Sequence, residues 1–456
     1  MLSKVTAALV LTSLVASCGV VGPQYQRPIL PLEQRFAFAS GPATQPAARD
    51  AWWEDLSDPV LNRIMSRALD ANLTVEAAVA RIAQAQAQVR ATGPASQLSG
   101  ETTLSARARW TDGDYTDTAQ AGTAPSFVLD LFGVRQRRHE VARAQLEAAE
   151  FDAAAARLAI QLAVAEAYLD LRFAQALENL RQRAIRNQAR VVDAARDREA
   201  LRAESKMAVR RTEAELQLQR ALLPAAQQNQ RVAVLRLATL LSEPYANVLS
   251  DIDQTHGQPT PKANISPGVP AELLKNRPDL RAAEARLRAA VAEVGVNEAQ
   301  LYPTLRLDGA ITLGADSTVA LGPTLSIPVL NRTSRLAARD AARAGAKEAE
   351  AIWRAEVRAS IEEVQLNLSQ LQTADQEVAA LLRAAATLRD AAGLTREAFR
   401  LQATTTLEIL DVEDRLTETE IRLITARRSF GQAWARLNVA IGQGWKAASS
   451  DIKSGP

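Results

Sequence analysis

The chain is short of the side chains from which most catalytic and metal sites are built. Its 456 residues include one cysteine, Cys18, which excludes intramolecular disulfides and clusters of thiolate ligands. The two histidines, His139 and His256, lie far apart in the sequence. We find no nucleophile–base pair and no phosphate-binding loop. We therefore expect a protein that is not an enzyme and that uses no cofactor and no metal.

An excess of charge of one sign is also lacking, and aromatic residues are few. Lys and Arg total 54 and Asp and Glu total 52, which gives a net charge of +2. This balance argues against a nucleic-acid-binding protein. Aromatic residues make up 4% of the chain, whereas Ala, Leu, Arg, Glu and Gln are abundant. Such a composition favours long helices.

The N-terminus has the features of an export signal. An apolar core at 5–15 follows a positively charged start and is too short for a membrane-spanning helix, which needs about 20 residues. Small residues then lead into Cys18, a pattern that resembles the lipobox of bacterial lipoproteins; the alternative is a plain signal peptide with an incidental cysteine. We expect a signal peptide at 1–17, lipid on Cys18 and a lipidated tether at 18–50. By the same resemblance, Gly19 favours anchoring in the outer membrane.

The rest of the chain is duplicated. Residues 72–89 match residues 277–294 at a constant offset of 205. Each copy is followed by a proline, two strand-like runs and a very long helical stretch. A repeat of this size indicates two structurally similar halves. We therefore expect four segments after the tether: a first repeat at 51–250, a proline-containing linker at 251–270, a second repeat at 271–445 and a tail at 446–456.

Each repeat contains two predicted strands. Alternation of apolar or small residues with polar ones predicts strands at about 98–110, 125–132, 304–314 and 319–330. The segment 111–124 is rich in Gly, Asp and Thr, and we predict a loop there. Pro323 and Pro328 interrupt the fourth strand, which is typical of an edge strand. Charged residues at alternate positions would line the polar interior of a barrel: Arg107, Arg109, Arg306 and Asp308.

The helical stretches 136–241 and 334–441 predict two long hairpins. Each is interrupted once, at 201–209 and at 401–407, where we place the tips. The arm 334–400 would be roughly 100 Å long, so its apolar stripe needs neighbouring helices. Four strands are too few for a membrane barrel, which needs about eight, so strands that cross a membrane must close with other copies of the chain. The alternative is a water-soluble four-stranded cap on a helical rod.

Several short motifs, taken in their order along the duplicated frame, carry a family resemblance. They are Val21-Gly22-Pro23-Gln24-Tyr25-Gln26-Arg27-Pro28, Trp52-Trp53, Asp58-Pro59, Leu129-Asp130-Leu131-Phe132-Gly133, Pro270-Ala271-Glu272-Leu273-Leu274, Arg277-Pro278-Asp279-Leu280, Gly322-Pro323, Leu410-Asp411 and Gly442-Gln443-Gly444-Trp445. Over nearly all of the mature chain, the protein resembles the TolC-like outer-membrane factors. Within them it is most similar to the lipoprotein branch that serves RND-type efflux systems.

The resemblance implies both a fold and a function. The fold is mainly α with a small membrane β part, and a homotrimer closes it into a twelve-stranded outer-membrane β-barrel on a twelve-helix periplasmic barrel. The function is a passive exit duct for drugs or other small toxic compounds, with a periplasmic adaptor and an inner-membrane RND-type transporter as partners. Two alternatives stay open. One is a component of type I-like protein secretion, and the other is a lipid-anchored periplasmic coiled-coil scaffold without a pore.

The resemblance also implies functional residues. In the family, the hairpin tips close the periplasmic end of the tunnel, and acidic residues near the second tip surround the constriction. Glu408 and Asp411 occupy that place here, three residues apart on one helical face; the alternative is a solvated helix face. Both tips depart from the family pattern, which often has glycine there. The residues expected to contact the adaptor are Arg202, Ser205, Gln402 and Thr405.

Overall fold

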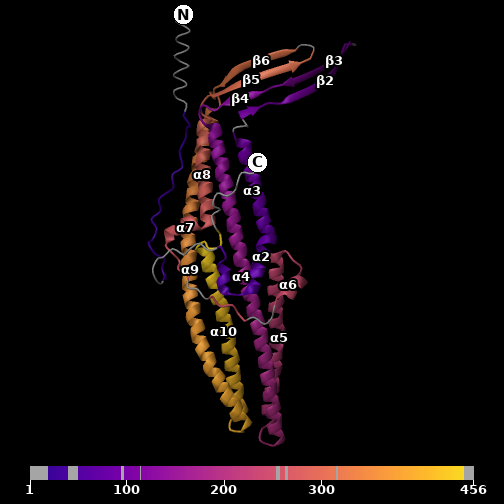
Figure 1. The fold of residues 1–456 in the computed structure, drawn as a ribbon, viewed down its shortest axis with the longest axis vertical. Coiled ribbons are helices and arrows are strands. Elements are labelled where there is room, and N and C mark those ends of the chain that lie inside the picture. The colour runs from indigo at the N-terminus through magenta and orange to yellow at the C-terminus, as the bar shows by residue number, and fades with distance from the viewer. Residues whose placement is uncertain are drawn as a thin grey trace. The chain divides into compact units, whose positions relative to one another are not determined.

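Figure 1 shows the chain in a computed structural model, which describes residues 19–39, 50–93, 97–112, 114–252, 257–261, 265–314 and 317–445. The chain divides into two compact units. The first, here called the strand unit, consists of the described residues within 1–31, 78–153 and 279–357. The second, the tip unit, consists of those within 32–77, 154–278 and 358–456. Each unit takes segments from both sequence repeats, so the repeats do not correspond to the compact units.

One antiparallel sheet belongs to the strand unit. Its strands are β1 (Leu98–Ser99), β2 (Thr102–Thr111), β3 (Asp114–Thr123), β4 (Ser126–Leu129), β5 (Thr304–Leu313) and β6 (Thr318–Ser326). β1 and β2 pair with β4 and β3 in one continuous register, from Leu98 opposite Phe127 to Thr111 opposite Asp114. β5 pairs with β4 and β3 on one side and with β6 on the other. Within the described part of the chain, β2 and β6 each pair along one side only and form the edges.

β3 occupies the segment 111–124, so the predicted loop there was wrong. The Asp112-Gly113 dipeptide is a strong sequence signal for a two-residue hairpin turn, and it indicates two strands here in place of a loop. Asp112 has a φ of 51°. On either side of the turn, the rings of Trp110 and Tyr115 pack edge to face with centroids 5.4 Å apart. Composition suggested a loop, but pairing with β2 gives these residues a ladder of backbone partners.

The fourth predicted strand is shorter than expected and lies at an edge. β6 ends at Ser326, before Pro328. Pro323 lies within β6 opposite Leu307 of β5. An edge strand tolerates proline because one row of its N–H groups has no partner in the sheet.

The two faces of the sheet differ in chemistry. The register places the following apolar side chains on one face: Leu104, Leu305, Leu307, Ile311, Leu313, Val319, Leu321 and Leu325. They are partly to largely exposed, up to 84% for Leu104. The opposite face carries Arg107, Arg109, Arg306 and Asp308, and Asp308 accepts a hydrogen bond of 2.6 Å from the Ser126 hydroxyl. An exposed apolar face backed by a polar one is the pattern of strands that face lipid on one side and a lumen on the other.

Two long helical hairpins dominate the chain. The helices are η1 (a 3-10 helix, Trp52–Leu56), α2 (Pro59–Ala71), α3 (Leu73–Thr92), α4 (Val134–Ala200), α5 (Lys206–Leu241), α6 (Tyr245–Asp251), α7 (Pro270–Asn276), α8 (Pro278–Ala299), α9 (Arg332–Arg400) and α10 (Thr406–Ala440). α4–α5 and α9–α10 confirm the predicted hairpins, and α4 and α9 contribute to both units. No helix in the described ranges has a stretch apolar enough to cross a bilayer.

The core of the tip unit explains two of the sequence motifs. The rings of Trp52 and Trp434 lie 5.7 Å apart. Trp52 Nε1 donates to Gln161 Oε1 at 3.1 Å, and Gln161 Nε2 donates to the Gly444 carbonyl at 3.0 Å. Gly444 has a φ of 105°, and a Cβ there would lie 2.2 Å from Gln161 Oε1. The tryptophan and C-terminal glycine motifs therefore hold this core together.

The segment 19–28, here called the strap, lies against the strand unit without regular secondary structure. The Arg137 guanidinium donates to the carbonyl oxygens of Val21 at 3.2 Å and Gly22 at 3.1 Å. Gly22 has a φ of 93°, and a Cβ there would lie 2.5 Å from the Cα of Gly295 in α8. Such close backbone contact requires glycine. Residues 19–28 of the predicted tether are therefore bound to the helices of the strand unit.

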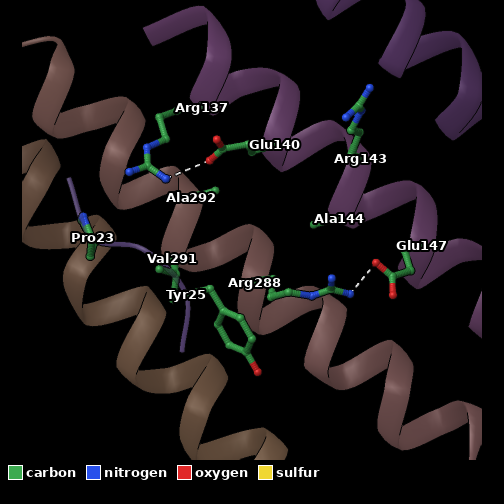
Figure 2. A pocket seen from close by; sticks show the side chains of 10 residues that line it. All are labelled: Pro23, Tyr25, Arg137, Glu140, Arg143, Ala144, Glu147, Arg288, Val291 and Ala292. Atoms are coloured by element: carbon green, nitrogen blue, oxygen red, sulfur yellow. Dashed lines mark hydrogen bonds and ion pairs between the residues drawn. The ribbon is translucent and has the colours of Figure 1, made fainter. Parts of the chain in front are cut away.

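A second set of contacts holds the strap at Tyr25 and Arg27. Tyr25 and Arg27 both donate to the carboxylate of Glu284, at 3.0 Å and 2.8 Å. The Tyr25 pKa is raised well above its usual range by burial and by the neighbouring Glu284 carboxylate. Figure 2 shows a cavity beside the strap, where Arg137 pairs with Glu140 and Arg288 pairs with Glu147. Arg143 takes part in neither of these ion pairs.

Candidate functional site

The two hairpin tips have the same backbone turn. The first spans 201–205 and the second spans 401–405, an offset of 401 − 201 = 200 residues. Arg202 and Gln402 are left-handed, with φ of 60° and 58°. In each tip a backbone hydrogen bond of 2.8 Å, from the residue after the left-handed one, closes the preceding helix in a Schellman motif. Arginine and glutamine therefore occupy two positions whose left-handed conformation favours glycine.

Side chains cap the helix that follows each tip. Ser205 accepts a hydrogen bond from the amide of Ala208 at 3.2 Å. Thr405 accepts one from the amide of Glu408 at 3.3 Å, and the Glu408 carboxylate accepts one from the amide of Thr405 at 3.2 Å. This second arrangement is a capping box. Ser205 and Thr405, which we predicted as adaptor contacts, are thus helix caps as well.

The charges that follow the two turns differ. Positions 200 residues apart carry Ala208 and Glu408, Arg211 and Asp411, Ala214 and Asp414, and Glu215 and Arg415. The first three turns of α10 therefore carry carboxylates where α5 has alanine or arginine. The carboxylates of Glu408, Asp411 and Asp414 therefore have no acidic counterpart at the matching positions of the first hairpin.

Glu408 and Asp411 are both exposed on α10. The Thr404 hydroxyl and the Thr405 amide donate to the Glu408 carboxylate and lower its pKa below the usual range. Asp411 pairs with Arg415 one turn later at 3.0 Å. The structure thus gives Glu408 a capping role that our sequence prediction did not include, and it places both carboxylates in water.

Asp414 is a third acidic residue of this surface, and our sequence reasoning missed it. Partial burial and the carboxylates of Glu215, Asp411 and Glu413 raise the pKa of Asp414 to about 6. The signal was present, because Asp414 follows Asp411 by three residues and so continues the same helical face. It is the side chain near this tip that is poised to titrate close to neutral pH.

One ion pair occurs in both hairpins, again 200 residues apart. In the first, Arg196 lies 2.6 Å from Glu213, and the two side chains are 55% and 23% exposed. In the second, Arg396 pairs with Glu413, whose side chain is 9% exposed. Glu413 also accepts a long hydrogen bond of 3.4 Å from Asn187 of α4. The same pair is therefore a surface contact in one hairpin and a buried contact in the other.

The two tips are joined within the chain. Arg198 donates to the carbonyl oxygens of Phe399 and Thr404, both at 3.3 Å, and lies 4.7 Å from the centroid of the Phe399 ring. Glu204 accepts a hydrogen bond of 2.5 Å from Thr406. A cluster of buried apolar side chains also joins the two hairpins here: Val191, Phe399, Ile409 and Leu410. Separation of the tips would break both sets of contacts.

The apex of each tip exposes apolar side chains at matching positions. Leu201 and Leu401 are 71% and 70% exposed, and Met207 and Leu407 are 80% and 55% exposed. The residues that we predicted to contact an adaptor are exposed beside them: Arg202, Ser205, Gln402 and Thr405. Exposed apolar groups within a polar rim are typical of a protein interaction site.

Two further sequence predictions concern lipid on Cys18 and the absence of a metal site. Cys18 lies outside the described residues. In the ranges that the structure does describe, no group of three or more His, Cys, Asp or Glu side chains could hold a metal ion.

These features define a class of protein. A sheet that exposes an apolar face and, within the described residues, has two unpaired edges is typical of a membrane barrel assembled from several copies. The chain belongs to the outer membrane efflux protein family, whose model matches residues 64–243 and 269–443.

Known proteins similar to this chain match it along almost its whole length. Nodulation protein T of Rhizobium leguminosarum bv. trifolii is 30% identical, over 95% of this chain and 96% of that protein. The pyoverdine export outer membrane protein OpmQ of Pseudomonas aeruginosa is 27% identical, over 95% and 97%.

Solved structures agree on the fold. The outer-membrane channel OprN is 26% identical with a TM-score of 0.85, over 93% of this chain and 99% of that one. The Campylobacter jejuni CmeC outer membrane channel, at 17% identity, has a TM-score of 0.86 over 94% and 96%. These comparisons confirm the trimeric channel fold and the outer-membrane location with a periplasmic helical extension. The protein is an outer-membrane efflux channel.

Proposed function

We propose that this channel is the exit duct of a tripartite efflux pump. It would conduct drugs or other small toxic compounds passively, from an inner-membrane transporter and a periplasmic adaptor, across the outer membrane. The open sheet supports this proposal most. If three copies joined edge to edge through β2 and β6, the backbone N–H and C=O groups of these edges would gain hydrogen-bond partners. Lipid cannot supply such partners. A scaffold without a pore has no use for such edges or for an exposed apolar face.

The gate in this proposal is formed by the first turns of α10. Threefold symmetry would bring together three copies each of Glu408, Asp411 and Asp414. So many carboxylates repel one another and favour cations, as carboxylate rings do in cation channels. The restriction of these acidic residues to one of two otherwise matching tips supports a function for them beyond solubility.

The adaptor in this proposal docks on both tips. Arg202, Ser205, Gln402 and Thr405 would form the polar rim of the contact. Leu201 and Leu401 would supply its apolar centre, because side chains desolvated near the middle of an interface contribute more binding energy than those at its rim. Lipid on Cys18 would keep each protomer attached to the outer membrane.

The transporter, rather than the duct, would select the cargo. The names of similar proteins attach one to pyoverdine export and another, CusC of Escherichia coli, to cation efflux. Their similarity along nearly the whole chain supports a common duct that serves chemically different cargoes.

Single-channel conductance in planar bilayers tests the duct and the gate together. Three purified proteins are compared: the wild type, a gate variant Glu408→Gln/Asp411→Asn/Asp414→Asn, and a control Asp193→Asn/Asp197→Asn on the first hairpin. Glutamine at 408 can still complete the capping box, so the gate variant removes charge and keeps the cap. We expect small cation-preferring openings in the wild type and the control. We expect weaker cation preference and wider openings in the gate variant.

Two results would contradict different parts of the proposal. Absence of conductance from well-folded protein in all three forms would reject the duct and favour a scaffold. Conductance with the same cation preference in all three would keep the duct and reject the gate.

A further inference from the structure

We propose that three arginines at the junction of strands and helices bind the head groups of anionic phospholipids in the inner leaflet of the outer membrane. They are Arg90 of α3, Arg138 of α4 and Arg332 of α9, here called the arginine collar. All three belong to the strand unit. The inference uses the outer-membrane location and is independent of which pump the channel serves.

The collar lies at the depth of lipid head groups. Arg138 follows Gly133, the last residue before α4, by five residues, or about 7 Å of helix. Arg332 is the first residue of α9, and Arg90 lies in the last turn of α3. The polar layer on each side of the hydrocarbon core is roughly 5–8 Å thick. Each collar residue therefore lies within or at the border of that layer when the strands span the core.

Two contacts mark this level in the structure. The rings of Phe132 and Tyr302 stack with centroids 4.7 Å apart, at the ends of the segments that lead from β4 and into β5. Aromatic side chains gather at membrane–water interfaces. The Thr92 hydroxyl lies 3.2 Å from His139 Nδ1, so the end of α3 lies beside the start of α4. Arg90 and Arg138 are thus on neighbouring helix ends just below the stacked rings.

The collar arginines have no protein counter-ion. All three are exposed, and none forms a side-chain hydrogen bond or ion pair with any residue that the structure describes. The arginines around them do have partners. Arg137 pairs with Glu140, and Arg343 pairs with Glu298. The acidic residue nearest the start of α4 is also engaged, since Asp130 accepts from two backbone amides of that helix at 2.9 and 3.0 Å.

The dipole of α3 favours Arg90, which lies in its last turn, but the start of α9 does not favour Arg332. The first turns of α4 and α9 contain no acidic residue. A cation near a helix N-terminus is repelled by the positive end of the helix dipole. Arg332, the first residue of α9, therefore stands where two positive contributions add, and an anion from outside the protein would remove that repulsion. Guanidinium groups bind phosphate oxygens in a two-pronged geometry, and basic residues beside a membrane attract anionic lipids.

The same three helices supply a matched control. Arg81, Arg143 and Lys347 are exposed and have no side-chain partner among the described residues. Arg143 lies about 15 Å along α4 from Gly133, and Lys347 lies about 22 Å along α9 from Arg332, both beyond the head-group layer. Arg81 is nine residues below Arg90 on α3. The control residues match the collar residues in charge, in helix and in unit, and they differ from them in depth along the helices.

The experiment compares retention of phosphatidylglycerol by purified trimers. The full lipidated protein is extracted in detergent and incubated with mixed micelles of phosphatidylcholine and phosphatidylglycerol. Bound lipid is then counted by mass spectrometry. The proteins are the wild type, the collar variant Arg90→Gln/Arg138→Gln/Arg332→Gln, the control Arg81→Gln/Arg143→Gln/Lys347→Gln, and a charge-keeping variant Arg90→Lys/Arg138→Lys/Arg332→Lys.

We expect phosphatidylglycerol binding to fall about fivefold for each collar arginine removed, since one basic residue at a membrane surface contributes about a factor of five. The control and the charge-keeping variant should retain most of the binding, and phosphatidylcholine should not respond. Equal loss in the control and collar variants would overturn the proposal. So would unchanged binding in the collar variant.

A second measurement covers the case in which the collar variant fails to assemble. Phosphatidylglycerol, but not phosphatidylcholine, should raise the temperature at which wild-type trimers dissociate, and added salt should abolish the increase. The same increase with both lipids, or an increase that survives salt, would reject head-group binding by the collar.

Discussion

The two hairpin tips share one backbone and differ in charge. Residues 201–205 and 401–405 form the same left-handed turn and cap the helix that follows. After it, α5 has alanine or arginine where α10 has carboxylates. Duplication kept the parts that fold the tip and let the exposed positions diverge. The first tip is therefore a natural internal reference for the second, since it holds the fold constant while the charge changes.

The sharpest test of this comparison is the ion pair that both hairpins contain. Arg396→Ala leaves the buried Glu413 carboxylate with a single long hydrogen bond, and we expect a loss of about 2–4 kcal/mol in the free energy of unfolding. Arg196→Ala removes the equivalent exposed pair and should change stability far less. Chemical denaturation of both variants, followed by helical circular dichroism, checks the difference. Equal losses would mean that burial does not separate the two hairpins.

A second test uses the titration of Asp414, whose pKa is raised to about 6. A raised carboxyl pKa means that the folded state binds its proton more tightly than the unfolded chain does. Stability from this group is therefore greatest at low pH and is lost as pH rises through about 6. Cation preference of the pore should rise over the same interval. We expect both pH dependences to weaken in Asp414→Asn. The Ala214→Ser variant, at the equivalent position of the first tip, should keep them.

The smallest expected effect concerns the turn itself. Arg202→Gly and Gln402→Gly place glycine at left-handed positions, where a Cβ is disfavoured. Each should raise the free energy of unfolding by roughly 0.5–1 kcal/mol, in line with the cost of non-glycine residues in this conformation. Thermal denaturation of the two single variants should show similar gains. A gain at one tip alone would show that the turns are not equivalent in energy.

Sequence periodicity predicted the features that depend on local pattern. The hairpins follow from apolar residues at three- and four-residue spacing, and strand β5 follows from strict alternation between Thr304 and Leu313. β3 was missed because its Gly, Asp and Thr content resembles a loop, and its pairing partner β2 is what fixes it as a strand. Composition alone cannot supply that partner.

The acidic surface was predicted in part. Glu408 and Asp411 came from a family motif, and nothing in that motif identifies Asp414. Its pKa is raised by partial burial and then by Glu215 of the other hairpin, and sequence spacing reveals neither. The capping role of Glu408 was also missed, although Thr405 three residues earlier is a recognisable capping signal. Contacts between hairpins are the part of the site that a linear pattern does not contain.

The two open edges of the sheet have a genetic consequence. Each protomer offers one β2 edge and one β6 edge, so a subunit damaged at a single edge can still join a neighbour through the intact one. A ring that incorporates it cannot close. When such an allele is expressed beside the normal copy, mixed assemblies would contain damaged subunits and would not form channels. The allele would therefore be dominant negative.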